Sequence, residues 1–189
     1  MKIVELTVGI VSTCCYILYR DEESTECIVI DPGDEAARIR KAAGGRKIAA
    51  ILLTHGHFDH IGAVTELMDA DTRLVIHELD APMLSDPELN AGLDLLQWEI
   101  TAPDATDLVK EGDELEIAGL KIQVLHTPGH TPGSVCYLIE GELFTGDTIF
   151  DHGWGRTDLP GGSGEQLTAS LRRMIPLVRE YPMHAGHNT

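Results

Sequence analysis

The sequence predicts an α+β fold in which two mixed β-sheets pack face to face with helices on the outside. Strand and helix patterns occur in two similar blocks, and each block ends in a polar loop. The apolar residues 48–53 have the length and composition of a strand that is buried on both faces. Residues 115–125 alternate apolar and polar residues around a short turn, and two apolar runs flank a second turn at residues 140–141, which is typical of β-hairpins. At 189 residues, the chain fits one domain with a sizeable core.

The first block predicts an antiparallel meander, a helix and the buried strand. Strand patterns lie at residues 2–8, 14–19, 27–30 and 48–53. Asp34 is placed to cap a helix that ends near Gly44, and an amphipathic helix over about residues 61–68 follows the buried strand. Residues 74–76 predict another strand. The acidic segment 77–103 contains three prolines and predicts short helices at a rim or lid.

The second block predicts two hairpins, a loop and a long helix. The hairpins cover residues 115–125 and 135–144 and turn at Gly119 and Gly141. Residues 153–164 are rich in glycine and predict a loop before a helix over residues 164–180. The expected apolar face of this helix consists of Leu167, Leu171, Ile175 and Val178.

Composition disfavours several classes of partner. The chain has 31 acidic and 14 basic residues, a net charge of −17, whereas phosphate recognition needs basic patches. No apolar run approaches the roughly 18 residues of a membrane span. Residues 1–5 lack the apolar core of a signal peptide, which favours the cytoplasm. Buried reduced thiols are expected at Cys14, Cys15, Cys27 and Cys136.

The segment 54–60, Thr-His-Gly-His-Phe-Asp-His, directly follows the buried strand and holds three of the nine histidines. Imidazole nitrogens and carboxylate oxygens bind zinc and other first-row divalent ions. His55 and His57 are two residues apart and can chelate one ion, because Gly56 allows a sharp turn between them. Asp59 and His60 lie further round the loop and suit a second ion.

Three more candidate ligands stand at later loop positions. His130 lies between two Thr-Pro-Gly triplets, which predict a stiff turn rather than a helix. Asp147 ends the second hairpin, and His187 follows Gly186 near the end of the sequence. Each residue alone has an ordinary structural explanation, but one ligand type at each strand end predicts a metal site.

These motifs together resemble the metallo-β-lactamase fold superfamily. In order, they are His-x-His-x-Asp-His, Pro-Gly-His-Thr-x-Gly-Ser, Thr-Gly-Asp and Gly-His-Asn. The segment 155–162 further resembles the small single-domain relatives of hydroxyacylglutathione hydrolase, the type II glyoxalase. The resemblance implies one domain over residues 1–189, a four-layer αββα sandwich with its metal site at one edge. Relatives usually continue past Gly-His-Asn with another helix, so His187 is expected on a frayed end that weakens the second ion site.

The resemblance also implies a site with two divalent metal ions, zinc in the first place and iron as the alternative. The implied ligands are His55, His57 and His130 for one ion, Asp59, His60 and His187 for the other, and Asp147 as the bridge. A water shared by two ions becomes hydroxide at neutral pH, and Asp59 would orient this nucleophile or take its proton. Arg156 and Lys110 are candidate contacts for an anionic substrate. His77, His126, His152 and His184 are left over as ordinary histidines.

The leading hypothesis is a hydrolase of small acylglutathione-like thioesters that attacks through the bridging hydroxide. The full-length glutathione enzymes have an extra helical domain that contacts glutathione, so specificity for glutathione stays open. The alternatives are a mononuclear iron enzyme like the persulfide dioxygenases and a metal-binding domain without activity. The diiron flavoprotein branch is disfavoured by His57, where that branch resembles a pattern with glutamate. Acidity and short length disfavour nucleases, and the missing signal peptide disfavours β-lactam hydrolysis.

Overall fold

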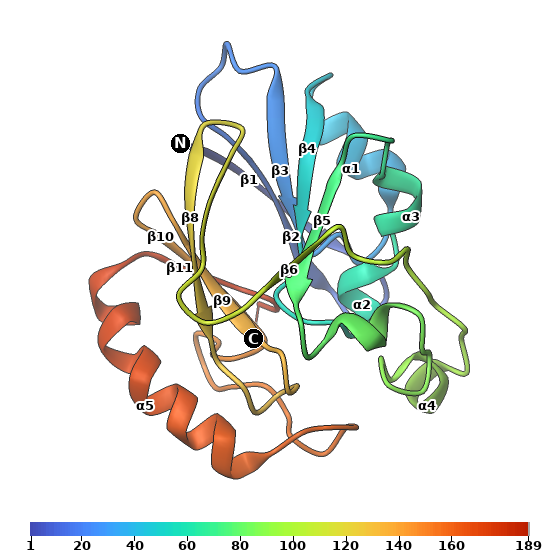
Figure 1. The fold of residues 1–189 in the computed structure, drawn as a ribbon, viewed down its shortest axis with the longest axis vertical. Helices are drawn as coiled ribbons and strands as arrows, with labels where there is room; N and C mark the ends of the chain where they lie inside the picture. Colours follow the sequence, from blue (N-terminus) through green and yellow to red (C-terminus); the bar gives the residue numbers. More distant parts are fainter. Residues whose placement is uncertain (189) are drawn as a thin grey trace.

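Two β-sheets form the centre of the protein, and helices cover their outer faces (Figure 1). The computed structural model describes residues 1–188. Within these residues, sheet A has six strands in the order β1-β2-β3-β4-β5-β6, and sheet B has five in the order β11-β10-β9-β8-β7. Both sheets are mixed, because β3 to β6 are parallel in sheet A and β10 pairs with β11 in parallel in sheet B. The predicted αββα sandwich is confirmed.

The elements follow the predicted order closely. The strands of sheet A are β1 (Lys2–Val8), β2 (Thr13–Tyr19), β3 (Glu26–Ile30), β4 (Lys47–Leu52), β5 (Arg73–His77) and β6 (Asp107–Val109). Those of sheet B are β7 (Glu114–Ile117), β8 (Leu120–His126), β9 (Val135–Ile139), β10 (Glu142–Gly146) and β11 (Met183–Ala185). The helices are α1 (Ala36–Ala42), α2 (Phe58–Ile61), α3 (Val64–Leu67), the 3-10 helix η1 (Ala81–Leu84), α4 (Gly92–Leu96) and α5 (Gly164–Glu180).

Strand β4 shows how the sandwich is held together. Side chains alternate across a strand, so neighbouring residues face opposite layers. Ile51 packs in the core under the helices, whereas its neighbours Ala50 and Leu52 pack in the core between the sheets. The prediction of a strand buried on both faces is confirmed, because β4 supplies both cores. The four cysteines are also buried and free of disulfides, as expected.

The buried face of α5 differs from the predicted one. Leu167 and Met174 are buried as one face, together with Ser170, while Ile175 is 41% exposed. The Ser170 hydroxyl donates to the Pro128 carbonyl at 2.7 Å, so a small polar side chain joins the buried face of the helix to the loop between β8 and β9. Apolar spacing alone could not reveal this contact.

Helix α2 begins earlier than predicted, at Phe58 rather than after the histidine motif. Asp59 and His60 therefore lie on a helical turn, and only His55 to His57 form a loop after β4. The expected cap at Asp34 is also wrong by one residue, because Glu35 precedes α1 in a left-handed conformation with φ 58°. Among the described residues, no helix combines the length and apolar character needed to cross a membrane.

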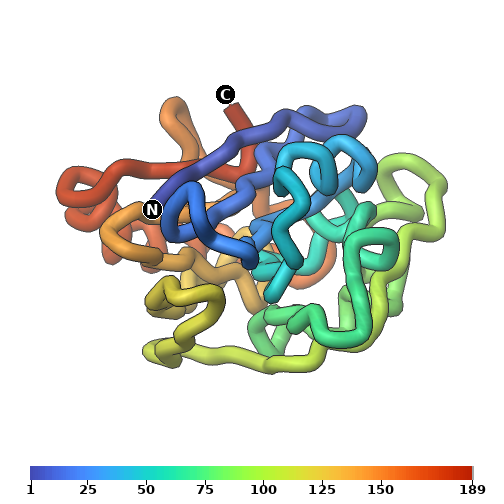
Figure 2. Tube along the Cα trace, turned by 90° about the horizontal axis from the view of Figure 1, so that it is seen from above, coloured from blue at the N-terminus to red at the C-terminus, as the bar shows by residue number. Residues whose placement is uncertain are grey.

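The two sheets are joined along one edge by the ends of the chain. Viewed from above, the C-terminal segment lies beside the N-terminal strands (Figure 2). The backbone of Thr13 forms a bridge with His187, and the Cys14 N–H donates to the Gly186 carbonyl at 2.8 Å. These contacts hold the described end of the chain against β2, which opposes the fraying expected there.

Candidate metal centre

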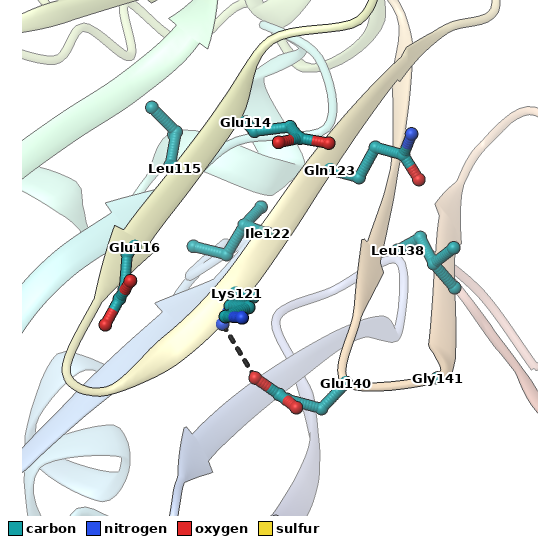
Figure 3. Close-up of a pocket in the computed structure, with 9 residues that line it drawn as sticks. All are labelled: Glu114, Leu115, Glu116, Lys121, Ile122, Gln123, Leu138, Glu140 and Gly141. Atoms are coloured by element: carbon teal, nitrogen blue, oxygen red, sulfur yellow. Dashed lines mark hydrogen bonds between the residues drawn. The ribbon is translucent and has the colours of Figure 1, made fainter.

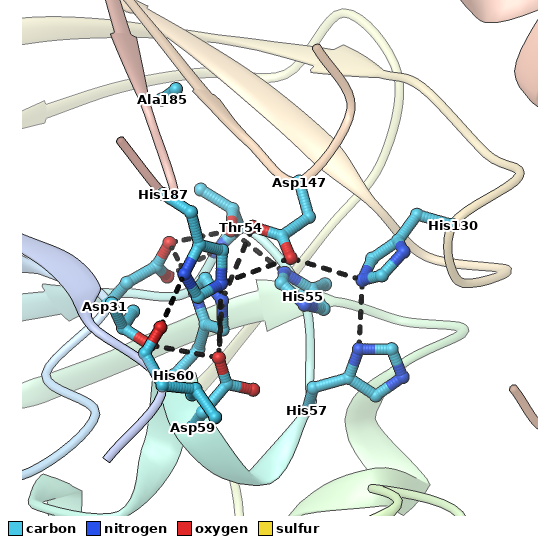
Figure 4. A network of polar contacts seen from close by, with 12 residues as sticks. Asp31, Thr54, His55, His57, Asp59, His60, His130, Asp147, Ala185 and His187 are labelled. Carbon is cyan, nitrogen blue, oxygen red and sulfur yellow. Dashed lines mark hydrogen bonds and ion pairs between the residues drawn. The ribbon is translucent and has the colours of Figure 1, made fainter. Parts of the chain in front are cut away.

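The predicted ligands converge at one edge of the sandwich, between the two sheets (Figure 4). The structure brings their nitrogen and oxygen atoms into overlapping groups of three, within 4.8 Å of one another. The groups are His55, His57 and His130; His55, His60 and Asp147; and Asp59, His60 and His187. All seven residues predicted as ligands belong to this cluster, which the text below calls the His/Asp cluster.

The first group joins the two sheets. His57 follows β4 of sheet A, and His130 lies in the loop between β8 and β9 of sheet B. His57 Nδ1 and His130 Nε2 are 2.9 Å apart. His130 Nδ1 donates to the Arg156 carbonyl at 2.7 Å, so the lone pair of its Nε2 faces the cluster.

His55 is oriented by a short chain of hydrogen bonds. The Thr54 hydroxyl donates to Asp31 Oδ2 at 2.7 Å, so His55 Nδ1 donates to that hydroxyl at 3.1 Å. The tautomer is thereby fixed with the lone pair on Nε2, which is buried without a hydrogen-bond partner. Asp31 also accepts the Thr54 N–H at 2.8 Å, so one carboxylate fixes the start of the motif.

The second group surrounds Asp59. Its Oδ2 lies 3.3 Å from His60 Nε2 and 3.2 Å from His187 Nε2, and accepts the Thr13 hydroxyl at 2.9 Å. His187 Nδ1 donates to the Val11 carbonyl at 3.2 Å, which turns Nε2 toward the cluster. His187 thus resembles His130 of the first group: Nδ1 donates a hydrogen bond to a backbone carbonyl, and Nε2 faces the carboxylates.

Asp147 stands between the two groups. Its carboxylate oxygens are 3.4 Å from His60 Nε2, 3.5 Å from His130 Nε2 and 3.4 Å from His187 Nε2. The preceding Gly146 has φ +49°, and a Cβ there would overlap the Thr54 side chain. Glycine therefore lets the end of β10 approach β4 closely enough to deliver the carboxylate.

Burial and neighbouring charges shift the pKa values of the histidines in the His/Asp cluster in opposite directions. Burial and the neighbouring histidines lower the pKa of His55, and they lower that of His57 to about 3, so both stay neutral. Burial also opposes the charged forms of His60 and His187, but the two carboxylates outweigh it and raise both pKa values, that of His187 to about 9. Despite burial, the charge on His60 lowers the pKa of Asp59.

The donor set fits metal ions. Buried polar atoms normally have hydrogen-bond partners. His55 Nε2, His57 Nε2, His60 Nε2 and Asp147 Oδ1 are buried without one, whereas His60 Nδ1 faces Asp31 Oδ2 at 3.0 Å. Several inner nitrogens present lone pairs in orientations fixed from outside, as metal-binding histidines usually do. Neutral imidazoles and carboxylates are ligands for zinc and iron alike, so the arrangement does not choose between these metals.

Two buried aspartates that support the cluster were missed by sequence reasoning. Asp31 directly follows β3, and Asp80 follows β5; both are at most 1% exposed. Parallel strands end at the same edge of a sheet, so an acidic residue just after a strand next to β4 was the available signal. Asp80 binds the loops that carry His57 and His130, as described below.

The predicted substrate contacts lie outside the cluster. The Arg156 guanidinium forms two hydrogen bonds with Asp158, at 2.6 and 2.7 Å, and both side chains are exposed. Arg156 reaches the cluster only through its backbone carbonyl. Lys110 is exposed after β6, and no described contact joins its side chain to the cluster.

The remaining histidines also lie outside the His/Asp cluster. His77 and His126 stack on each other with ring centroids 4.1 Å apart, and His184 contacts Glu142 at 2.8 Å. His152 is exposed. An open hollow of about 740 Å³ lies between the β7–β8 and β9–β10 hairpins (Figure 3). Its lining contributes to none of the potential metal-binding groups found within residues 1–188.

The family assignment rests on the match of nearly the whole chain. A model of the metallo-beta-lactamase superfamily matches residues 9–187. The chain belongs to this superfamily. Among relatives, it is 36% identical over 193 residues to the probable metallo-hydrolase YqgX of Bacillus subtilis, covering 99% of this chain and 90% of the relative. It is 34% identical over 183 residues to the hydroxyacylglutathione hydrolase GloC of Haemophilus influenzae, covering 93% and 85%.

Solved structures of superfamily members are similar over their length. The crystal structure of the BLEG-1 B3 metallo-beta-lactamase has a TM-score of 0.92 and 36% identity, covering 100% of this chain and 92% of that one. The structure of TTHA1623 in a di-iron-bound form has a TM-score of 0.85 and 34% identity, covering 98% and 92%. Metal binding at the His/Asp cluster is expected for the fold. The similar proteins carry different named activities, and one of them has a di-iron-bound form.

Proposed function

We propose that this member of the metallo-hydrolase superfamily is a dinuclear thioesterase that cleaves small acylglutathione-like thioesters. One observation carries the proposal: two groups of three ligand atoms lie side by side, and Asp147 lies within 3.5 Å of nitrogens from both. The similarity to a named hydroxyacylglutathione hydrolase supports the choice of substrate class. Zinc is the proposed metal, and iron is the alternative that the di-iron form of a relative supports.

In this proposal, His55, His57 and His130 hold one ion and the Asp59 group holds the other. When bound, the ions act as Lewis acids on the thioester carbonyl and lower the pKa of a shared water toward 7. Asp147 keeps the two ligand groups together. Asp59 orients the attacking water, because its Oδ2 is fixed by Thr13 and its Oδ1 makes no described hydrogen bond.

An apolar surface beside Asp59 suits the acyl part of a substrate. Ile10 and Val11 in the β1–β2 turn are 68% and 42% exposed, and Trp98 after α4 is 48% exposed. These three side chains line a small hollow that Asp59 also borders. We call Ile10, Val11 and Trp98 the apolar rim. Such a contiguous exposed apolar patch is typical of a binding surface.

The test combines metal analysis with a panel of substrates. We expect about two metal ions per chain and hydrolysis of acylglutathione thioesters by the metal-loaded protein. A chromogenic β-lactam belongs in the panel, because a B3 metallo-beta-lactamase is similar to this chain. One iron per chain with oxygen uptake on a persulfide would refute the thioesterase proposal. Two bound ions without turnover of any panel member would favour a metal-binding domain without activity.

A further inference from the structure

We propose that Asp80 is a positioning residue that fixes the two ligand loops of the metal centre relative to each other. This inference rests on the proposed metal site, but not on the thioester substrate. Asp80 lies just after β5 and is 0% exposed. It is not a member of any group of potential ligands among the described residues, so its role would be exerted through its neighbours.

The Asp80 carboxylate accepts hydrogen bonds from both loops. Its Oδ2 accepts the Gly56 N–H at 3.1 Å and the Thr131 hydroxyl at 2.6 Å, and its Oδ1 accepts the Gly133 N–H at 2.6 Å. Gly56 lies between His55 and His57 in the loop after β4, whereas Thr131 follows His130 in the loop between β8 and β9. One buried side chain therefore links ligand loops from different sheets.

The surroundings are shaped for this carboxylate. A Cβ at Gly133 would lie 2.7 Å from Asp80 Oδ1, and a Cβ at Gly56 would lie 2.6 Å from the Met83 side chain. Only glycine fits at these two positions without displacing the turn that carries Asp80. The turn is itself fixed, because the Asp80 N–H donates to the His77 carbonyl and the Asp80 carbonyl accepts the Met83 N–H, both at 3.0 Å.

The three hydrogen bonds require both carboxylate oxygens of Asp80 to act as acceptors. All three partners donate hydrogen bonds, and only an ionised carboxylate accepts with both oxygens. An asparagine would point an NH₂ group at one of these donors and leave it without an acceptor in a buried place. The loop carrying His57 or the loop carrying His130 would then shift. Because their facing nitrogens are only 2.9 Å apart, a small shift changes the geometry offered to an ion.

The experiment compares Asp80→Asn with Asp107→Asn. Asp107 is a matched control, because its carboxylate accepts hydrogen bonds from Arg73 and Thr106 in sheet A, away from both ligand loops. Zinc affinity is measured by competition with a chromophoric chelator. Changes to groups that orient metal ligands typically cost 10–100-fold in affinity. We expect Asp80→Asn to weaken at least one ion by about 10-fold and Asp107→Asn to change neither by more than about twofold.

The visible spectrum of the cobalt-substituted protein gives a second readout, because it reports ligand geometry rather than stability. We expect it to change in Asp80→Asn and not in Asp107→Asn. Should Asp80→Asn not fold, Thr131→Val removes the hydroxyl that contacts Asp80 and Ser134 Oγ, and leaves the two N–H donors to Asp80 in place. This variant should then show the altered spectrum and the weaker zinc binding.

The outcomes separate this inference from the proposed function. Wild-type affinity and a wild-type cobalt spectrum in both Asp80→Asn and Thr131→Val would overturn the positioning role. Wild-type protein that binds two ions and cleaves no thioester would overturn the proposed activity and leave the role of Asp80 standing. A wild-type chain that binds no ion would overturn both.

Discussion

His57 Nδ1 and His130 Nε2 face each other at 2.9 Å although 73 residues separate them in the sequence. His130 Nδ1 already donates to the Arg156 carbonyl, so without an ion the proton between the two rings belongs to His57. An ion bound at His57 Nδ1 would move that proton to Nε2, so this pair changes tautomer without releasing a proton. His60 and His187 would release protons instead, because the carboxylates raise their pKa values, that of His187 to about 9. Ion binding is therefore expected to release protons and to weaken as pH falls.

Replacing His57 tests the first ion site. We expect His57→Ala to lower thioester hydrolysis by at least about 100-fold, since a Lewis acid contributes several kcal/mol and each 1.4 kcal/mol is a factor of ten. The fold should persist, because the side chain contributes to the cluster rather than to the apolar cores. The measurements are initial rates and circular dichroism. His152→Ala, at an exposed histidine, is the control, and full activity of His57→Ala would contradict the metal mechanism.

Metal ions should stabilise the fold. An ion that binds only the native state adds about 2.7 kcal/mol at 100 times its Kd. For a chain of this size, 1 kcal/mol raises Tm by about 2–4 °C, so a rise of about 5–10 °C is expected when zinc is added to chelator-treated protein. Differential scanning fluorimetry measures this shift. His57→Ala should show a smaller rise, and an equal rise in both proteins would argue against the assigned ligands.

The apolar rim should act on substrate binding. We expect Trp98→Ala to raise KM for a thioester with an apolar acyl group about 3–10-fold with little change in kcat, because the lost contact is made equally before and during the reaction. The control is Leu108→Ala, which shortens an apolar side chain that is also exposed, on the edge strand β6. The effect should shrink for a short acyl group. A loss confined to kcat would show that Trp98 acts on the centre instead.

Stability should fall as pH drops below about 6.5, in part through His77. Burial and the stacked His126 lower the pKa of His77 to about 4, from an ordinary value near 6.5. Between these values the unfolded chain binds the extra proton, so the contribution of His77 is present above pH 6.5 and lost toward pH 4. We expect a loss of up to about 2 kcal/mol between pH 7 and pH 5. Urea unfolding of wild type and His77→Gln at both pH values isolates the contribution of His77 to the free energy of unfolding. If both proteins lost the same stability between pH 7 and pH 5, this contribution would be contradicted.

Most of the fold could be predicted because its elements carry their own patterns. The hairpins, the buried β4 and the long helix α5 have periodicities that survive in any context. The three-residue strands β6 and β11 escaped prediction, because they exist only through pairing with β5 and β10. The buried face of α5 was misplaced for a similar reason, since the contact between Ser170 and Pro128 is tertiary.

The members of the His/Asp cluster could be predicted from the sequence, but the buried residues that hold them in place could not. His55, His57, Asp59 and His60 share one short motif, so their convergence follows from local geometry. Asp31 and Asp80 carry no such spacing, and their value as acceptors appears only when distant loops bring donors to them. Whether His130, Asp147 and His187 bind ions as the motifs imply stays a prediction, although they lie where that role requires.

The bridge between Thr13 and His187 has a consequence for synthesis in the cell. A ribosome delivers the chain from the N-terminus, and domains begin to fold during this delivery. The ligands after β4 leave the ribosome while the residues that complete their surroundings are still unmade. The second ion site can close only after residue 187 has emerged and has paired with a strand made near the beginning. Metal binding at the second site should therefore occur late in synthesis. Ribosome-stalled chains from which residue 187 has not yet emerged should bind ions poorly.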